Sequence, residues 1–148
     1  MNNTNHFSNS NETKIRITYH DTDQMGVVYY GNYPTFFEIG RTELLRSTGA
    51  TYKLWETEHK ILLPVVECHL HYHKPAHYDD VLRIKTTLTS LSKIAAVFSY
   101  EIFNDETNEL LTTGYTKHPF IDETGKIKRI ADKLMPEWYS ALNNKPTK

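Results

Sequence analysis

Apolar residues from position 66 onward recur at every second position, in four runs separated by short polar connections. A period of two is typical of strands that bury one face. A parallel crossover needs a dozen or more residues, more than these connections provide, so we predict an antiparallel sheet. The four predicted strands are residues 66–72, 82–88, 94–102 and 109–120.

A fifth strand and one long helix precede these runs. Residues 14–19 alternate polar and apolar side chains, which predicts a half-buried strand. Asn32 can then cap a helix that ends near Gly49, because the apolar residues between them follow the spacing of an α-helix. This apolar stripe consists of Tyr33, Phe36, Phe37, Gly40, Leu44 and Leu45. One helix and one antiparallel sheet can bury their apolar faces only if the sheet curls around the helix.

The remaining segments are shorter or more polar. Residues 1–13 are mostly Asn, Ser and Thr and have almost nothing to bury, so we expect a disordered polar tail. We predict a short extra helix over residues 51–59 and a terminal helix that begins at Pro136. Residues 14–148 would then form a single α+β domain without internal repeats or linkers.

The composition excludes several classes of partner. The chain has 17 Lys and Arg against 18 Asp and Glu, so its net charge of −1 gives no basic field for nucleic acid or an anionic membrane. It has no apolar run near the roughly 20 residues of a membrane-spanning helix and no secretory signal. The single cysteine, Cys68, fits a reducing compartment. We expect a cytoplasmic protein that neither inserts into membranes nor binds nucleic acid.

Assembly into an oligomer is favoured by the same composition. Only 39% of the residues are apolar, which gives a single copy of the chain a thin core. A single curled sheet also leaves edge strands that a second copy can cover. We therefore expect a homodimer or a homotetramer.

The loop over residues 19–33 is the densest candidate for a functional site. It contains Asp21 and Asp23 and leads into a helix N-terminus, where unpaired N–H groups can stabilise a developing oxyanion. A carboxylate a few residues upstream could activate water or attack an electrophile itself. In the alternative interpretation these aspartates are ordinary turn residues, and Gly26 only supplies a positive φ.

A second candidate is the sequence Cys-His-Leu-His-Tyr-His at residues 68–73. Alternation places His69, His71 and His73 on one face of a strand, where two of them could share a zinc ion. The same residues also fit a polar outer face, and no further ligand is evident, so we predict no metal site. Cys68 is expected to pack as a small buried hydrophobic residue.

The candidate loop and the helix after it carry a family resemblance. Residues 19–33 read Tyr-His-Asp-Thr-Asp-Gln-Met-Gly-Val-Val-Tyr-Tyr-Gly-Asn-Tyr. With Phe36-Phe37-Glu38 and Arg41-Thr-Glu43, they resemble the signature of hotdog-fold acyl-CoA thioesterases of the 4-hydroxybenzoyl-CoA thioesterase type, including the bacterial Tol-Pal-associated subgroup. Further matches are residues 63–65, 75–80 and 114–118. The resemblance implies a hotdog fold, in which one curled antiparallel sheet of about five strands wraps around a long central helix.

The resemblance also implies roles for individual residues. Asp23 matches the catalytic carboxylate of the family, as general base or as nucleophile. Tyr30 matches the position at the start of the helix where a backbone N–H polarises the thioester carbonyl. The expected substrate-binding residues are Asn32, Tyr33, Lys93 and Lys117, with the two lysines on the phosphates of coenzyme A. The active site is expected at a dimer interface.

The function expected from these residues is hydrolysis of acyl-CoA thioesters to free acid and coenzyme A. The thioester is weakly stabilised by resonance and thiolate leaves readily, so neither a metal nor an organic cofactor is expected. One alternative is a non-catalytic acyl-thioester binding or scaffold module. Another is a hotdog acyl-thioester dehydratase, but the helix carries Glu38 and Glu43 without the histidine that such an enzyme would need.

Overall fold

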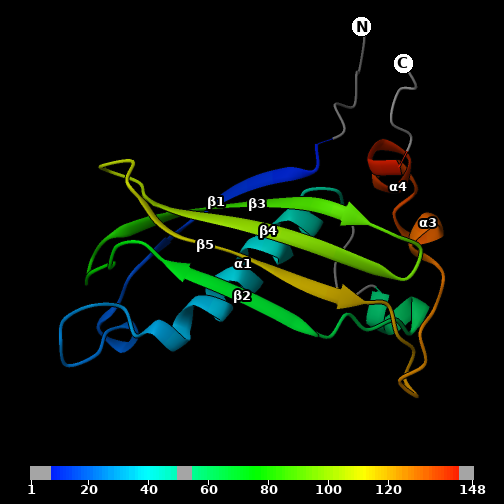
Figure 1. The fold of residues 1–148 in the computed structure, drawn as a ribbon, viewed down its shortest axis with the longest axis horizontal. Helices are drawn as coiled ribbons and strands as arrows, with labels where there is room; N and C mark the ends of the chain where they lie inside the picture. The colour runs from blue at the N-terminus through cyan, green and yellow to red at the C-terminus, as the bar shows by residue number, and fades with distance from the viewer. Residues whose placement is uncertain (1–7, 50–54, 144–148) are drawn as a thin grey trace, which may run out of the picture.

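The computed structural model describes residues 8–49 and 55–143. One antiparallel sheet with strand order β1-β3-β4-β5-β2 curls around the long helix α1 (Tyr33–Arg46), as Figure 1 shows. The strands are β1 (Ser10–Arg16), β2 (Glu67–Tyr72), β3 (Val81–Leu91), β4 (Ala95–Asn104) and β5 (Leu110–Pro119). The predicted antiparallel α+β fold around a central helix is confirmed.

Short helical segments complete the described chain. Single 3₁₀ turns, η1 (Tyr19–Asp21) and η2 (Tyr30–Asn32), lie in the loop before α1. The extra helix predicted over residues 51–59 is a π-helical segment, η3 (Trp55–His59), and residues 51–54 lie outside the described residues. The predicted terminal helix is α4 (Pro136–Asn143), which follows the short helix α3 (Ala131–Leu134).

Strand β1 begins earlier than the hydrophobic pattern predicts. Residues 10–13 pair with β3, and next to them the Leu88 N–H donates to the carbonyl of Asn9 at 2.8 Å. Backbone pairing needs no apolar side chain, so a polar edge strand carries no hydrophobic signal. The tail predicted over residues 1–13 therefore does not extend to residues 10–13, and residues 1–7 lie outside the described part of the chain.

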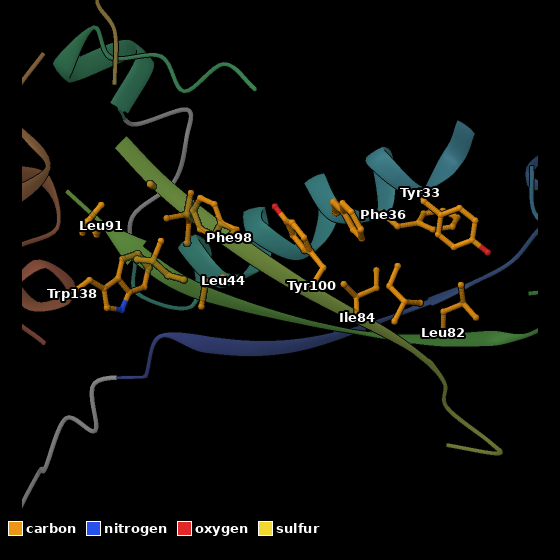
Figure 2. Packing of buried hydrophobic residues seen from close by; sticks show 14 of the residues in the cluster. Tyr33, Phe36, Leu44, Leu82, Ile84, Leu91, Phe98, Tyr100 and Trp138 are labelled. Carbon is orange, nitrogen blue, oxygen red and sulfur yellow. The ribbon is translucent and has the colours of Figure 1, made fainter. Parts of the chain in front are cut away.

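The core lies between α1 and the inner face of the sheet. Figure 2 shows buried side chains of α1, such as Phe36 and Leu44, gathered with Phe98 and Tyr100 of β4. The ring of Phe37 stacks on Tyr100 with 4.0 Å between centroids. All the residues of the predicted apolar stripe are buried, so this stripe is the contact that holds the helix to the sheet.

A chain of hydrogen bonds crosses this apolar core. Burial, with the nearby charge of Arg41, lowers the pKa of His118 to about 4, so the imidazole is neutral at pH 7. Its Nδ1–H donates to the Leu63 carbonyl at 3.1 Å, which leaves Nε2 to accept from Thr116 at 2.7 Å. The Thr116 hydroxyl then accepts from Tyr100 at 2.6 Å. This order of donors fits only the neutral form of His118.

The packing of α1 against the sheet can be tested at Gly40. A Cβ at this position would lie 2.2 Å from the hydroxyl oxygen of Thr86 and 2.8 Å from a methyl carbon of Ile84. Gly40→Ala should lower the free energy of unfolding by about 1–3 kcal/mol, because overpacking outweighs the better helix propensity of alanine. Urea denaturation measures this change. Glu38→Ala, at an exposed position of α1, is the control and should stay within about 0.5 kcal/mol of wild type.

The buried histidine predicts a pH dependence of stability. The unfolded chain protonates His118 near pH 6.5 and the folded chain only near pH 4. The free energy of unfolding should therefore fall as the pH drops from about 6.5 to about 4, by up to about 1.4 kcal/mol per pH unit. In His118→Gln this contribution to the slope should disappear, whatever the loss of stability at pH 7. An identical slope for both proteins in urea titrations would contradict the assignment.

Candidate active site

The loop before α1 forms a small turn centred on Gly26. The Asp23 N–H donates to the carbonyl of Val27 at 2.9 Å, and the Gly26 N–H donates back to the carbonyl of Asp23 at 3.0 Å. Gly26 has a φ of 79°, which residues with a side chain rarely adopt. The backbone therefore forms a turn, as one interpretation of the sequence expects, and this turn fixes the position of Asp23.

The carboxylate of Asp23 is half-buried and has one oriented oxygen. Its Oδ1 accepts a hydrogen bond from the Met25 N–H at 2.8 Å. Among the described residues, Oδ2 has no hydrogen-bond partner and the carboxylate forms no ion pair. One oxygen therefore holds the side chain in place, and the other is available to a water molecule or a substrate.

Asp21 has a different environment from Asp23. Its Oδ2 accepts from both the N–H and the hydroxyl of Thr18, at 2.8 and 2.9 Å. Its backbone carbonyl accepts from the Tyr29 N–H and from Asn32 Nδ2, each at 2.9 Å. Asp21 therefore joins the end of β1 to the start of α1 and has a structural role in the loop.

The side chain of Asn32 also bonds to Asp21. The side chain was expected to cap α1, but it forms no capping hydrogen bond to the helix, whereas its expected contact with substrate stays a prediction. Its amide group donates to the Asp21 carbonyl instead, so Asn32 holds the loop against the helix N-terminus.

The start of the helix presents a backbone donor. The carbonyl of Tyr29 accepts from the Asn32 N–H at 3.0 Å, and thus points along the helix. In a trans peptide the next N–H, that of Tyr30, points the opposite way, out from the helix N-terminus. Within residues 8–49 and 55–143 this N–H has no acceptor, and the Tyr30 side chain is 65% exposed. The donor is thus free to bind an anion or a polarised carbonyl.

A cavity of about 260 Å³ lies beside this helix N-terminus. Its walls come from the end of the loop, the first turn of α1 and the end of β2. It is lined by Val28, Tyr30, Tyr33, Tyr72, His73, Lys74 and Pro75. Tyr33, expected to bind substrate, lies in this wall and is only 2% exposed.

Two residues of this cavity, Tyr72 and Lys74, are not among the functional residues predicted from the sequence. Tyr72 looks like an ordinary apolar strand position, and Lys74 like a charged residue before a turn. Only the strand order brings the end of β2 to the start of α1. Lys74 pairs with Glu109, and Tyr72 donates from its hydroxyl to the carbonyl of Tyr30 at 2.9 Å.

The two lysines expected to bind coenzyme A lie elsewhere. Lys93 is in the turn between β3 and β4, at the end of the sheet opposite to the start of α1 (Figure 1). Lys117 pairs with Glu67, whereas Tyr72 by the cavity pairs with Thr112. Five strand residues therefore separate Lys117 from the cavity, or about 17 Å. Within one chain these lysines do not share a site with Asp23.

His69 and His71 lie on the outer face of β2, and His73 follows directly after the strand. All three histidines are exposed, and the rings of His71 and His73 stack with 4.2 Å between centroids. In the described part of the chain, no group of three or more His, Cys, Asp and Glu side chains is arranged to hold a metal ion. The expected burial of Cys68 is wrong, because β2 is an edge strand and this residue is exposed. No helix among the described residues is long and apolar enough to cross a membrane.

Comparison with known proteins gives consistent matches. The profile of the Thioesterase superfamily matches residues 25–111, which include α1 but begin two residues after Asp23. The chain is 32% identical over 128 residues to the putative acyl-CoA thioesterase YneP of Bacillus subtilis, covering 86% of this chain and 91% of that protein. It is 38% identical over 97 residues to the acyl-CoA thioester hydrolase YbgC of Escherichia coli O6:H1, covering 66% of this chain and 71% of that protein.

A solved structure extends the similarity to three dimensions. The DHNA-CoA thioesterase from Staphylococcus aureus superimposes with a TM-score of 0.82 at 36% sequence identity. The superposition covers 93% of this chain and 97% of that chain, so it includes nearly all of the described fold.

Proposed function

Since this chain belongs to the thioesterase superfamily, we propose that it hydrolyses acyl-CoA thioesters to a free acid and coenzyme A by means of Asp23 and the N-terminus of α1. The named relatives support the reaction class at the level of the family. The chain supplies its own support for the site, because the same loop carries an oriented carboxylate and leads into a helix N-terminus with a free N–H. That combination favours an enzyme over a binding module.

Asp23 supplies the attack on the thioester. As general base, its free oxygen takes a proton from water while the water oxygen attacks the carbonyl carbon. As nucleophile, the same oxygen attacks the carbonyl carbon and forms a mixed anhydride, which water then hydrolyses. In both routes the C–S bond breaks, and the coenzyme A thiolate leaves and takes up a proton. The hydrogen bond from Met25 to Oδ1 holds the carboxylate ready for either route.

The backbone N–H of Tyr30 supplies the oxyanion site. The carbonyl oxygen gains negative charge as the tetrahedral intermediate forms, and this N–H together with the dipole of α1 stabilises the charge. The bonds from Tyr29 and Asn32 to the Asp21 carbonyl keep the donor in place before substrate binds. Tyr30 thus acts through its backbone, and Tyr33 lines the adjoining cavity where part of the substrate binds.

A homodimer completes the site. The His73 N–H donates to β5, so by the alternation of antiparallel strands the backbone groups of Cys68, Leu70 and Tyr72 face the open edge of the sheet. Val66, next to this edge, is 58% exposed. If β2 paired antiparallel with β2 of a second copy, the sheet of the second copy would run in the opposite direction. The end of that sheet that carries Lys93 and Lys117 would then lie toward the Asp23 end of the first copy. The two lysines would then bind coenzyme A phosphates across the interface.

Asp23 is tested by a substitution that keeps its shape. Asp23→Asn should lower kcat by about 10²–10⁴-fold, the usual contribution of a positioned base, and KM should change much less. Release of free thiol from a panel of acyl-CoA substrates measures both constants. Asp21→Asn is the matched control, with a smaller loss because its carboxylate bonds to Thr18. A folded Asp23→Asn protein with wild-type turnover would refute the mechanism.

The dimer is tested at the free edge of β2. Cys68→Pro removes an N–H that faces away from β5, so it should preserve the fold of each chain and block pairing with a second copy. Light scattering after size-exclusion chromatography should then show a monomer with little thioesterase activity, while Cys68→Val stays dimeric. Circular dichroism confirms that the variant is folded. A wild-type monomer with full activity would exclude a site shared between two copies.

A further inference from the structure

Tyr72 makes a contact between the edge of the sheet and the start of α1. It is the last residue of β2, and its hydroxyl donates to the backbone carbonyl of Tyr30 at 2.9 Å. The two residues are 42 positions apart in sequence, so the bond exists only in the folded chain. It is a direct hydrogen bond to the residue whose N–H forms the proposed oxyanion site.

The Tyr30 carbonyl can accept a donor from outside the helix. In an α-helix a carbonyl accepts from the N–H four residues later. For Tyr30 that residue is Pro34, which has no N–H. The 3₁₀ turn at Tyr30 pairs this carbonyl with the N–H three residues later, that of Tyr33, and the hydroxyl of Tyr72 adds a second donor from outside the helix.

The phenol is held firmly enough to orient the backbone. Its ring packs edge-on against Tyr33, with 5.2 Å between centroids, and against Tyr30, with 6.4 Å. The next residue, His73, donates its backbone N–H to the Leu111 carbonyl of β5 at 2.8 Å and so ties the end of β2 to the sheet. Burial raises the pKa of Tyr72, so the hydroxyl keeps its proton and remains a donor at neutral pH.

Two hydrogen bonds together define the direction of the Tyr30 N–H. The bond from Asn32 to the Tyr29 carbonyl orients the peptide before Tyr30, and the bond from Tyr72 orients the peptide after it. On the basis of the proposed function, we infer that Tyr72 is a positioning residue of the thioesterase reaction. It acts through the backbone of Tyr30 and does not itself touch the reacting atoms.

Tyr72→Phe tests this role, because it keeps the ring and removes only the donor. We expect kcat to fall about 3- to 10-fold, the equivalent of one hydrogen bond, with KM nearly unchanged. The amide resonance of Gly31 should shift in a ¹⁵N spectrum, since its N–H shares a peptide group with the Tyr30 carbonyl. Tyr115→Phe is the matched control, a tyrosine of similar exposure on the outer face of β5, and should change neither quantity.

The outcomes separate this inference from the proposed function. An active wild type with an unchanged kcat in Tyr72→Phe overturns the positioning role alone. An unshifted Gly31 resonance shows that the hydrogen bond is not formed in solution, and also overturns it. A wild type that hydrolyses no acyl-CoA overturns the proposed function and, with it, the role of Tyr72.

Discussion

The structure depends on how closely α1 approaches the sheet. Glycine makes this approach possible on both partners: Gly40 of α1 lies against β3, and a Cβ on Gly114 of β5 would come within 2.8 Å of the Phe37 ring. Phe37 therefore packs directly over Gly114 and stacks on the neighbouring Tyr100, and such close packing opposes a shift of the helix along the sheet. The same packing determines where α1 begins, and so where its free N–H groups lie.

The candidate site uses backbone groups more than side chains, which limits what a sequence can reveal. The hydrophobic periods predict the five strands and the central helix because burial determines them. The resemblance adds Asp23 and Tyr30. The early start of β1 and the exposure of Cys68 escape prediction, because both follow from the edge position of a strand, and strand order is not encoded in local pattern.

Tyr72 and Lys74 escape prediction for a related reason. Each has an ordinary residue type for its place in the sequence, and becomes part of the cavity only because β2 ends beside the start of α1. Lys93 and Lys117 show a related effect of topology. They were expected in one site with Asp23 at a dimer interface, and register and topology place them toward the other end of the sheet of the same chain, so only a second copy could bring them to Asp23. A set of residues with matching chemistry forms one site only where the topology brings its members together.

The position of β2 would link the proposed dimer to the proposed catalytic site. This strand supplies the open edge that a second copy would cover, and its last residue holds the Tyr30 carbonyl. Tyr72 is 43% exposed in a single chain, so water can compete with its hydroxyl for the Tyr30 carbonyl. Pairing at the edge would exclude that water and strengthen the bond, because a hydrogen bond gains when its surroundings become less polar. A dimer built on β2 would therefore do more than add lysines across the interface, since it would also stiffen the oxyanion site of each copy.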